Sequence, residues 1–272
     1  MYISAILTAI FYGIVQGVTE WLPISSTGHL ILLEGILPLH AEEKFRIVFD
    51  VVIQLFSLMA VLSVYVKQLN PFVKKEKVCI LPDRMKMWYK ILIAALPSAV
   101  GGLLFDDAIE KYLFNPTCVA VCLILYGILF MLIERLTKVR AVEITTPTAL
   151  KIGAFQTLAL IPGTSRSGAT IIGGLLCGLS RAEAARFSFF MALPTMLGAS
   201  ALKLWKFFSE GNTMALDEIT LLLVGGVSAY IVSLAVIRCL IDFLNKHSFC
   251  VFGIYRIFVG AVILVYTYLE RM

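Results

Sequence analysis

Charged residues are scarce in this sequence. Asp, Glu, Lys and Arg together make up 15% of its 272 residues, whereas 60% are apolar. A soluble domain of this length needs more charge to cover its surface, so that class is excluded. The mean hydropathy is +0.91, and several apolar runs reach the roughly 20 residues that cross the hydrocarbon core of a bilayer. The composition therefore predicts a polytopic membrane protein.

Residues that build metal cages or disulfide frameworks are also few. The three histidines are scattered, and the six cysteines include no C-x-x-C pair and lie mostly in apolar segments. We therefore expect the cysteines to be small apolar filler. The first stretch lacks the basic start of a cleavable signal peptide. The net charge of +5 does not predict nucleic-acid binding, because the basic residues are confined to particular loops.

Six segments are long and apolar enough to cross a membrane as helices. We expect these spans at residues 45–66, 88–105, 117–136, 185–208, 219–241 and 249–269. They predict an all-α integral membrane fold.

The basic residues indicate how the spans are oriented. The loop at 67–87 carries six Lys or Arg and two Asp or Glu, and an excess of basic residues in a short loop marks the cytoplasmic side. The loops at 137–149 and 242–248 are then cytoplasmic too. Those at 106–116 and 209–218 are net acidic and extracytoplasmic. Six crossings put both termini outside.

Two further apolar regions, 2–39 and 150–179, are each interrupted by a polar turn. They are entered from opposite sides, and we expect both to be re-entrant pairs of half-helices lining a shared cavity, since a helix break at membrane depth must be satisfied by protein or water. A shift of 140 residues places Gln16 on Gln156, Ser25 on Ser165, Thr27 on Ser167 and Gly28 on Gly168. This predicts one membrane domain, 1–272, built as an inverted-topology repeat of about 1–140 and 141–272.

The first break contains a carboxylate where hydropathy predicts membrane. Gln16 and Glu20 are four residues apart and share one face of a helix. An ionisable side chain at membrane depth is a functional candidate by default. The alternative is an interfacial glutamate near the aqueous surface.

Three hydroxyl groups follow this carboxylate. Ser25, Ser26 and Thr27 precede a new helix, and helix capping accounts for one or two of them but not for all three. His29 is within reach of Ser26 as a proton acceptor or donor. The alternative role for His29 is a structural hydrogen bond.

The second break places a guanidinium between two hydroxyls, in the run Ser165, Arg166, Ser167 and Gly168. Arginine binds phosphate oxygens through two parallel hydrogen bonds, and the N-terminus of the following helix adds a fixed positive end. This pattern predicts an anion site. Alternatively, Arg166 pairs with Glu20 only to neutralise a buried charge.

Arg256 lies seven residues into an otherwise apolar span, so we expect it to supply a second positive charge to the cavity. Beside the candidate catalytic residues, the predicted substrate-binding residues are Gln16, Ser25, Thr27, Gly28, Ser165, Ser167, Gly168 and Arg256.

Residues 16–29, QGVTEWLPISSTGH, and residues 162–170, PGTSRSGAT, closely resemble the motifs of the bacterial undecaprenyl-diphosphate phosphatase family of the bacitracin-resistance type. The resemblance covers essentially the whole chain, including 181–194 and 254–258. It implies a hydrolase of the bacterial cytoplasmic membrane whose active site faces the extracytoplasmic side. Such an enzyme converts undecaprenyl diphosphate into undecaprenyl phosphate and inorganic phosphate, and so recycles the carrier lipid of cell-wall synthesis.

The resemblance also implies a role for each motif residue. Glu20 matches the essential carboxylate, Ser26 the proposed nucleophile, His29 the motif histidine and Arg166 the phosphate-binding arginine. Gln16 stands where the family commonly has Glu but accepts Gln, which weakens any mechanism that needs two carboxylates. The family's activity requires a divalent cation, so we expect Mg²⁺ or Ca²⁺ with Glu20 as a ligand.

Two chemistries stay open at this point. In one, Ser26 attacks the terminal phosphorus and Glu20 or His29 takes its proton; in the other, water attacks directly and Ser26 only donates a hydrogen bond. The alternative functions are a transporter or flippase of a phosphorylated polyprenyl lipid, and a non-catalytic lipid-binding scaffold. The expected partners are polyprenyl diphosphate and membrane lipid, with no nucleic acid, and the oligomeric state is open.

Overall fold

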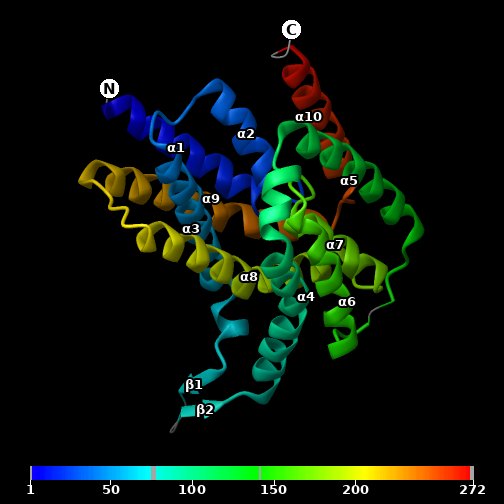
Figure 1. The fold of residues 1–272 in the computed structure, drawn as a ribbon. Coiled ribbons are helices and arrows are strands. Elements are labelled where there is room, and N and C mark those ends of the chain that lie inside the picture. The colour runs from blue at the N-terminus through cyan, green and yellow to red at the C-terminus, as the bar shows by residue number, and fades with distance from the viewer. Residues whose placement is uncertain (1, 75–77, 141, 270–272) are drawn as a thin grey trace.

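The computed structural model describes residues 2–74, 78–140 and 142–269, and its regular secondary structure is helical apart from one short hairpin (Figure 1). Lys75, Glu76 and Lys77, which enter the charge count of the 67–87 loop, lie outside the described residues, as does the first residue of the second predicted repeat. The elements are α1 (Tyr2–Thr19), α2 (Ser26–Ile36), α3 (Glu43–Leu69), β1 (Phe72–Lys74), β2 (Val78–Ile80), α4 (Pro82–Leu113), α5 (Pro116–Leu136), α6 (Thr146–Thr157), the 3₁₀ turn η1 (Leu158–Leu160), α7 (Arg166–Leu176), α8 (Arg181–Ser209), α9 (Leu216–Leu244) and α10 (Cys250–Leu269). The predicted all-α fold is confirmed.

Six of the described helices are long and apolar enough to cross a membrane: α3, the Pro82–Phe105 part of α4, α5, α8, α9 and α10. Each overlaps one of the six predicted spans, so that prediction is confirmed. Several run beyond the predicted limits, and in α8 a capping residue accounts for the earlier start. Ser180 starts α8 with a capping box in which its side chain and that of Glu183 each bond the other's backbone.

The two halves of the chain repeat the same order of elements. In the first half, two short helices around a break, α1 and α2, precede the long helices α3, α4 and α5. In the second half, α6 and α7 precede α8, α9 and α10 in the same way. The antiparallel hairpin of β1 and β2, in which Phe72 pairs with Ile80, interrupts only the first half and was not predicted. The inverted orientation of the halves stays a prediction.

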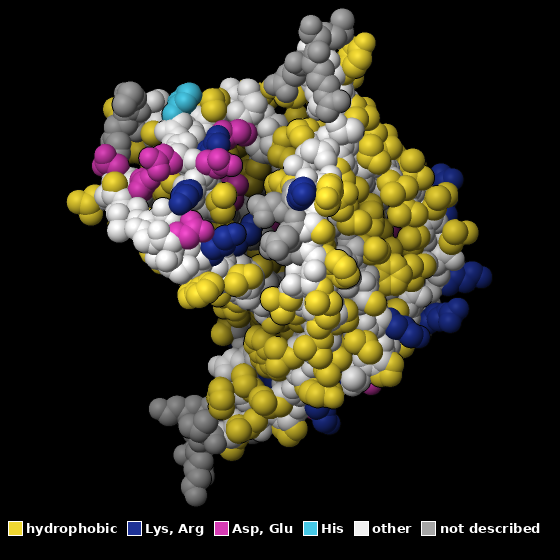
Figure 2. All heavy atoms as spheres, viewed as in Figure 1, with side chains coloured by type: hydrophobic (Ala, Val, Ile, Leu, Met, Phe, Trp, Pro, Cys, Tyr) yellow, Lys and Arg dark blue, Asp and Glu magenta, His cyan; other side chains and the backbone are white. Residues whose placement is uncertain are grey.

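The surface of the molecule has a broad apolar area. Large apolar side chains cover a broad area of it in Figure 2, and many of them lie on the outward faces of the spanning helices. Acidic and basic side chains gather together in the upper left of that view, whereas Lys and Arg predominate along its right and lower edges. Because helices satisfy their own backbone hydrogen bonds, an apolar helical surface of this kind is stable against hydrocarbon.

Close packing of α1 against α9 positions the first break. A Cβ atom at Gly13 would lie 2.2 Å from the backbone oxygen of Gly225, and one at Gly17 would lie 2.7 Å from that of Ala229. Only glycine lets the two backbones approach so closely. The helix that carries Gln16 toward the centre of the molecule is therefore held by direct backbone contact.

Candidate functional site

Both helix breaks end in the same backbone turn. Ser25 and Ser165, which precede α2 and α7, each have φ of 71°, and they are the only non-glycine residues with positive φ in the described part of the chain. Their side chains accept hydrogen bonds from the backbone nitrogens of Gly28, at 3.5 Å, and Gly168, at 3.1 Å. Non-glycine residues adopt this conformation at a cost in energy and are found mainly where function requires it.

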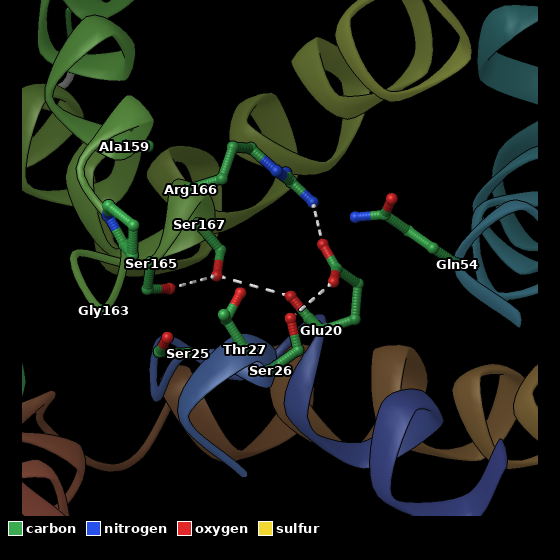
Figure 3. Close-up of a pocket in the computed structure, with 11 residues that line it drawn as sticks. Glu20, Ser25, Ser26, Thr27, Gln54, Ala159, Gly163, Ser165, Arg166 and Ser167 are labelled. Carbon is green, nitrogen blue, oxygen red and sulfur yellow. Dashed lines mark hydrogen bonds and ion pairs between the residues drawn. The ribbon is translucent and has the colours of Figure 1, made fainter. Parts of the chain in front are cut away.

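The breaks meet at Glu20, whose carboxylate is almost fully buried, with 6% of the residue exposed. Its Oε1 accepts a hydrogen bond from Arg166 Nη2 at 3.0 Å. Its Oε2 accepts one from Ser26 Oγ at 2.9 Å and one from Gln16 Nε2 at 3.0 Å. Figure 3 shows the links to Arg166 and Ser26. The carboxylate thus joins the predicted hydroxyl and the predicted guanidinium, which are far apart in the sequence.

Arg166 is fixed from several sides. Its Nη1 donates to the backbone oxygen of Ser188 at 2.9 Å, and its guanidinium lies 5.6 Å from the centre of the Trp21 ring. Its Nε is buried and has no hydrogen-bond partner among the described atoms. A buried guanidinium held in this way is pre-oriented, with donor capacity left for an anion.

Ser167 ties the second break to the first. Its Oγ donates to the backbone oxygens of Leu22, at 3.3 Å, and Glu20, at 3.4 Å, and lies 3.1 Å from Ser165 Oγ. These contacts connect backbone carbonyls of the first break to the second break, and the Leu22 oxygen also accepts a hydrogen bond from Ile24 N at 2.8 Å. They hold the first turns of α2 and α7 beside the same space (Figure 3).

That space is a cavity of about 170 Å³. It is lined by Glu20, Ser25, Ser26, Thr27, Gln54, Ala159, Pro162, Gly163, Ser165, Arg166 and Ser167. The N-terminal turns of two helices contribute to the lining, and helix N-termini favour negative charge. A carboxylate, several hydroxyls, a guanidinium and two helix ends therefore surround one space, and this combination is chemically suited to bind a phosphate group beside a hydroxyl.

His29 is turned away from this cavity. Its Nδ1 lies 2.7 Å from the backbone oxygen of Ser25, and its Nε2 lies 2.8 Å from the hydroxyl of Tyr255, on whose ring it stacks. Both ring nitrogens are therefore engaged. Three other predicted residues do not line the reaction cavity but bond to residues that do: Gln16 to Glu20, Gly28 to Ser25 and Gly168 to Ser165.

Arg256 is fully buried behind the breaks rather than in the cavity lining. Its guanidinium donates to five backbone oxygens, those of Pro23, Cys122, Leu123, Gly163 and Thr164, at 2.9 to 3.5 Å. Pro23 belongs to the first break, and Gly163 and Thr164 to the second. Its position indicates that it holds the two turns together.

Gln54 lines the cavity but was absent from the sequence-based candidates. It projects from α3, a spanning helix that contains neither break (Figure 3). The sequence pattern that could have identified Gln54 is its four-residue spacing from Asp50 and Arg46, which puts three polar residues on one face of an apolar segment.

The donor set fits a divalent cation only together with a substrate. In the described part of the chain, no three His, Cys, Asp or Glu side chains gather as a metal site, and Glu20 is the one carboxylate of the cavity lining. Mg²⁺ is commonly held by one or two carboxylates, water and substrate phosphate oxygens. Glu20, with the neighbouring hydroxyls of Ser26 and Thr27, would supply the protein's share of such oxygens.

The chain is similar to known proteins over nearly its whole length. The family model for bacitracin resistance protein BacA matches residues 9–262. An undecaprenyl-diphosphatase of Enterococcus faecalis is 46% identical over 272 residues, covering 98% of this chain and 99% of its own. One of Streptococcus thermophilus is 48% identical, covering 97% and 94%, and undecaprenyl-diphosphatase 1 of Clostridioides difficile is 48% identical, covering 97% of each.

Proposed function

The chain belongs to the bacitracin-resistance BacA family, and we propose that Glu20, Ser26 and Arg166 are the catalytic residues of its active site. It is a membrane enzyme that hydrolyses undecaprenyl diphosphate to undecaprenyl phosphate and inorganic phosphate. The observation that carries the residue assignment is the 2.9 Å hydrogen bond from Ser26 Oγ to Glu20, whose other oxygen pairs with Arg166.

In the first step, Ser26 Oγ attacks the terminal phosphorus and Glu20 takes its proton. The bond between this phosphorus and the bridging oxygen breaks, and undecaprenyl phosphate leaves with the proton from Glu20. Arg166 and the N-termini of α2 and α7 stabilise the charge that spreads over the phosphoryl oxygens. The prenyl chain stays in the lipid throughout.

In the second step, water attacks the phosphoserine. Glu20 takes a proton from the water and returns it to Ser26 Oγ as the bond between serine and phosphorus breaks, which releases inorganic phosphate. Glu20 is favoured over His29 as the base, because Ser26 already donates to Glu20 while both nitrogens of His29 are engaged elsewhere. Direct attack by water, with Ser26 as a hydrogen-bond donor only, remains the competing chemistry.

A divalent cation, Mg²⁺ or Ca²⁺, is proposed to bind with the diphosphate and to use Glu20 as a ligand. When bound, it would neutralise charge on the phosphate oxygens. Since both oxygens of Glu20 already accept hydrogen bonds, binding of the cation and release of one of these bonds are expected to occur together.

We also propose that the active site opens to the extracytoplasmic side. A second cavity adjoins the first and is lined near the start of α3 by Arg46, just after the end of α4 by Phe114, and toward the end of α8 by Lys203. The charge distribution of the loops predicts that all three helix ends are extracytoplasmic. The diphosphate of a lipid in the outer leaflet would then reach Ser26 without crossing the bilayer.

Phosphate release by the purified protein in detergent, with polyprenyl diphosphate as substrate, tests the assignment. Arg166→Lys keeps a positive charge beside Glu20 but loses the planar fork, and we expect kcat to fall about 100-fold or more. Ser26→Ala should be similarly impaired. Ser63→Ala, which removes an exposed hydroxyl elsewhere on α3, is the matched control and should retain normal activity.

Substrate carrying ³²P in its terminal phosphate separates the two chemistries. Acid-stable label on the wild-type protein that disappears in Ser26→Ala supports the phosphoserine. A fully active Ser26→Ala protein that never carries label would exclude it. Near-normal phosphate release by Arg166→Lys would remove Arg166 from the proposed mechanism.

A further inference from the structure

The reaction cavity has a larger neighbour. This second cavity has a volume of about 410 Å³ and shares Ser26, Thr27 and Gln54 with the first. Ser26 and Thr27 belong to the first break, whereas Gln54 comes from the opposite side, on α3. Gln54 therefore lies where the two cavities join.

Charged side chains line the second cavity. Arg46 forms an ion pair with Glu34 at 2.6 Å, and Asp50 and Lys203 also face the space. Arg46, Asp50 and Gln54 follow one another at four-residue spacing, so they form a polar stripe along α3 from its first turns to the reaction cavity. Charges at membrane depth are stable when they line a water-filled space. The second cavity is thus suited to hold water.

The carboxamide of Gln54 is available to form hydrogen bonds with water or substrate. It extends from α3 toward Glu20 and Arg166 in Figure 3, and it makes no hydrogen bond to another residue of the described chain. A carboxamide can accept a hydrogen bond from water with its oxygen and donate one to a phosphate oxygen with its nitrogen. It cannot take a proton from water, so it needs a base beside it.

Hydrolysis consumes one water molecule, which must reach phosphorus inside a membrane segment. We propose that Gln54 is a water-positioning residue: it orients the attacking water, supplied through the second cavity, while Glu20 takes the proton. This rests on the proposed function. The water oxygen bonds to phosphorus, its proton passes to Glu20, and the bond from phosphorus to Ser26 Oγ breaks as that oxygen is protonated. Glutamine has the same role in some enzymes that hydrolyse phosphoanhydrides.

The test replaces Gln54 with leucine, which is close in size and makes no hydrogen bond. Misplaced water should lower kcat about 100-fold, while KM changes less than about threefold because the phosphate contacts of Arg166 remain. With ³²P-labelled substrate, Gln54→Leu should accumulate serine-bound label, since the second step slows more than the first.

Gln156→Leu is the matched control. Gln156 is a buried glutamine near the end of the short helix α6, where it donates to Ser98 at 2.6 Å and lines neither cavity. Its replacement should leave kcat unchanged. If Gln54→Leu does not fold, Gln54→Asn, which withdraws the same amide by one carbon, should show a smaller fall in kcat in the same direction.

The outcomes separate this inference from the proposed function. Normal kcat in the Gln54 variant, or a raised KM with unchanged kcat, would overturn the water-positioning role. If the role of Gln54 is overturned in this way but Ser26→Ala is inactive in the same assay, the proposed active site stands without the water-positioning role of Gln54. A fall in kcat without accumulated label supports Gln54 as the residue that orients water for direct attack.

Discussion

Two arginines close to the proposed active site have different surroundings. Arg166 lines the cavity and pairs there with Glu20, and in the proposed mechanism its charge acts on the phosphate. Arg256 instead donates hydrogen bonds to five backbone oxygens. A guanidinium has five N–H donors in a rigid plane, which suits it to satisfy several carbonyls that two irregular turns leave unpaired.

Replacement of Arg256 by methionine is expected to destabilise the protein. It would leave buried carbonyls of both breaks without donors, and the free energy of unfolding should fall by about 3 kcal/mol or more. Equilibrium unfolding in detergent, followed by helicity, measures the effect. Phosphate release should fall as well, because the turns that hold Ser26 and Arg166 lose their shared support.

Arg238→Met is the control for loss of an arginine from a spanning helix. Arg238 is exposed on α9, and its replacement should change stability by less than about 0.5 kcal/mol. Equal stability of the Arg256 and Arg238 variants would show that the carbonyls of the breaks do not depend on Arg256.

At the level of helices, the crossing of α1 and α9 decides where the first break lies. Gly13 and Gly17 bring α1 onto the backbone of α9, and Ser233 on α9 donates to the backbone oxygen of Gly17 at 3.3 Å. Gln16 is held between these two glycines in the chain. A change in the distance or angle between α1 and α9 would therefore move Gln16 and Glu20 relative to Arg166.

Gly13→Ala should separate the two helices. Its Cβ atom would lie 2.2 Å from a backbone oxygen, and backbone cannot move aside as a flexible side chain can. Overpacking of this kind costs about 1 to 3 kcal/mol or more. We expect a lower midpoint of denaturation in detergent together with reduced phosphate release.

Gly198→Ala provides the comparison. Gly198 is also within a spanning helix, α8, and a Cβ atom there would meet nothing within 4 Å. Alanine is the better helix former, so this variant should be as stable as the wild type or slightly more so. A Gly13→Ala protein with the same stability would contradict close backbone packing of α1 on α9.

For the whole molecule, the proposed orientation makes the two ends of the helix bundle accessible from opposite sides of the membrane. In Figure 1 the start of α1 and the end of α10 lie in the upper part of the view, and the hairpin of β1 and β2 lies at the bottom. The hairpin contains Cys79, an exposed free cysteine within the 67–87 loop. Thr213 lies exposed in the opposite loop, between α8 and α9.

Labelling with a membrane-impermeant maleimide tests the orientation. In a protein whose other cysteines are replaced, Cys79 should react only after the cells are permeabilised, because its loop carries the excess of basic residues. Thr213→Cys, in a background without Cys79, should react in intact cells. Labelling of Cys79 in intact cells would invert the proposed orientation and place the active site on the cytoplasmic side.

The sequence by itself determined the number and position of the spanning helices. Span length and apolar composition are local properties that every lipid-exposed helix must satisfy, so all six predictions agree with the structure. The two breaks were also evident locally, because Ser25 and Ser165 precede new helices as capping residues. The hairpin of β1 and β2 was missed, since short polar loops carry no strong strand pattern.

Only the tertiary structure decided which side chains meet. Glu20 and Arg166 are 146 residues apart in the chain, and the sequence left open whether Glu20 lies at an interface or in a buried site. The sequence also could not predict that His29 bonds to Tyr255 or that Arg256 bonds to the carbonyls of the breaks. Nor could it predict that Gln54 lines the cavity. A polar residue in an apolar helix can face any neighbour until the helices pack, and backbone contacts such as that of Gly13 with Gly225 fix that choice.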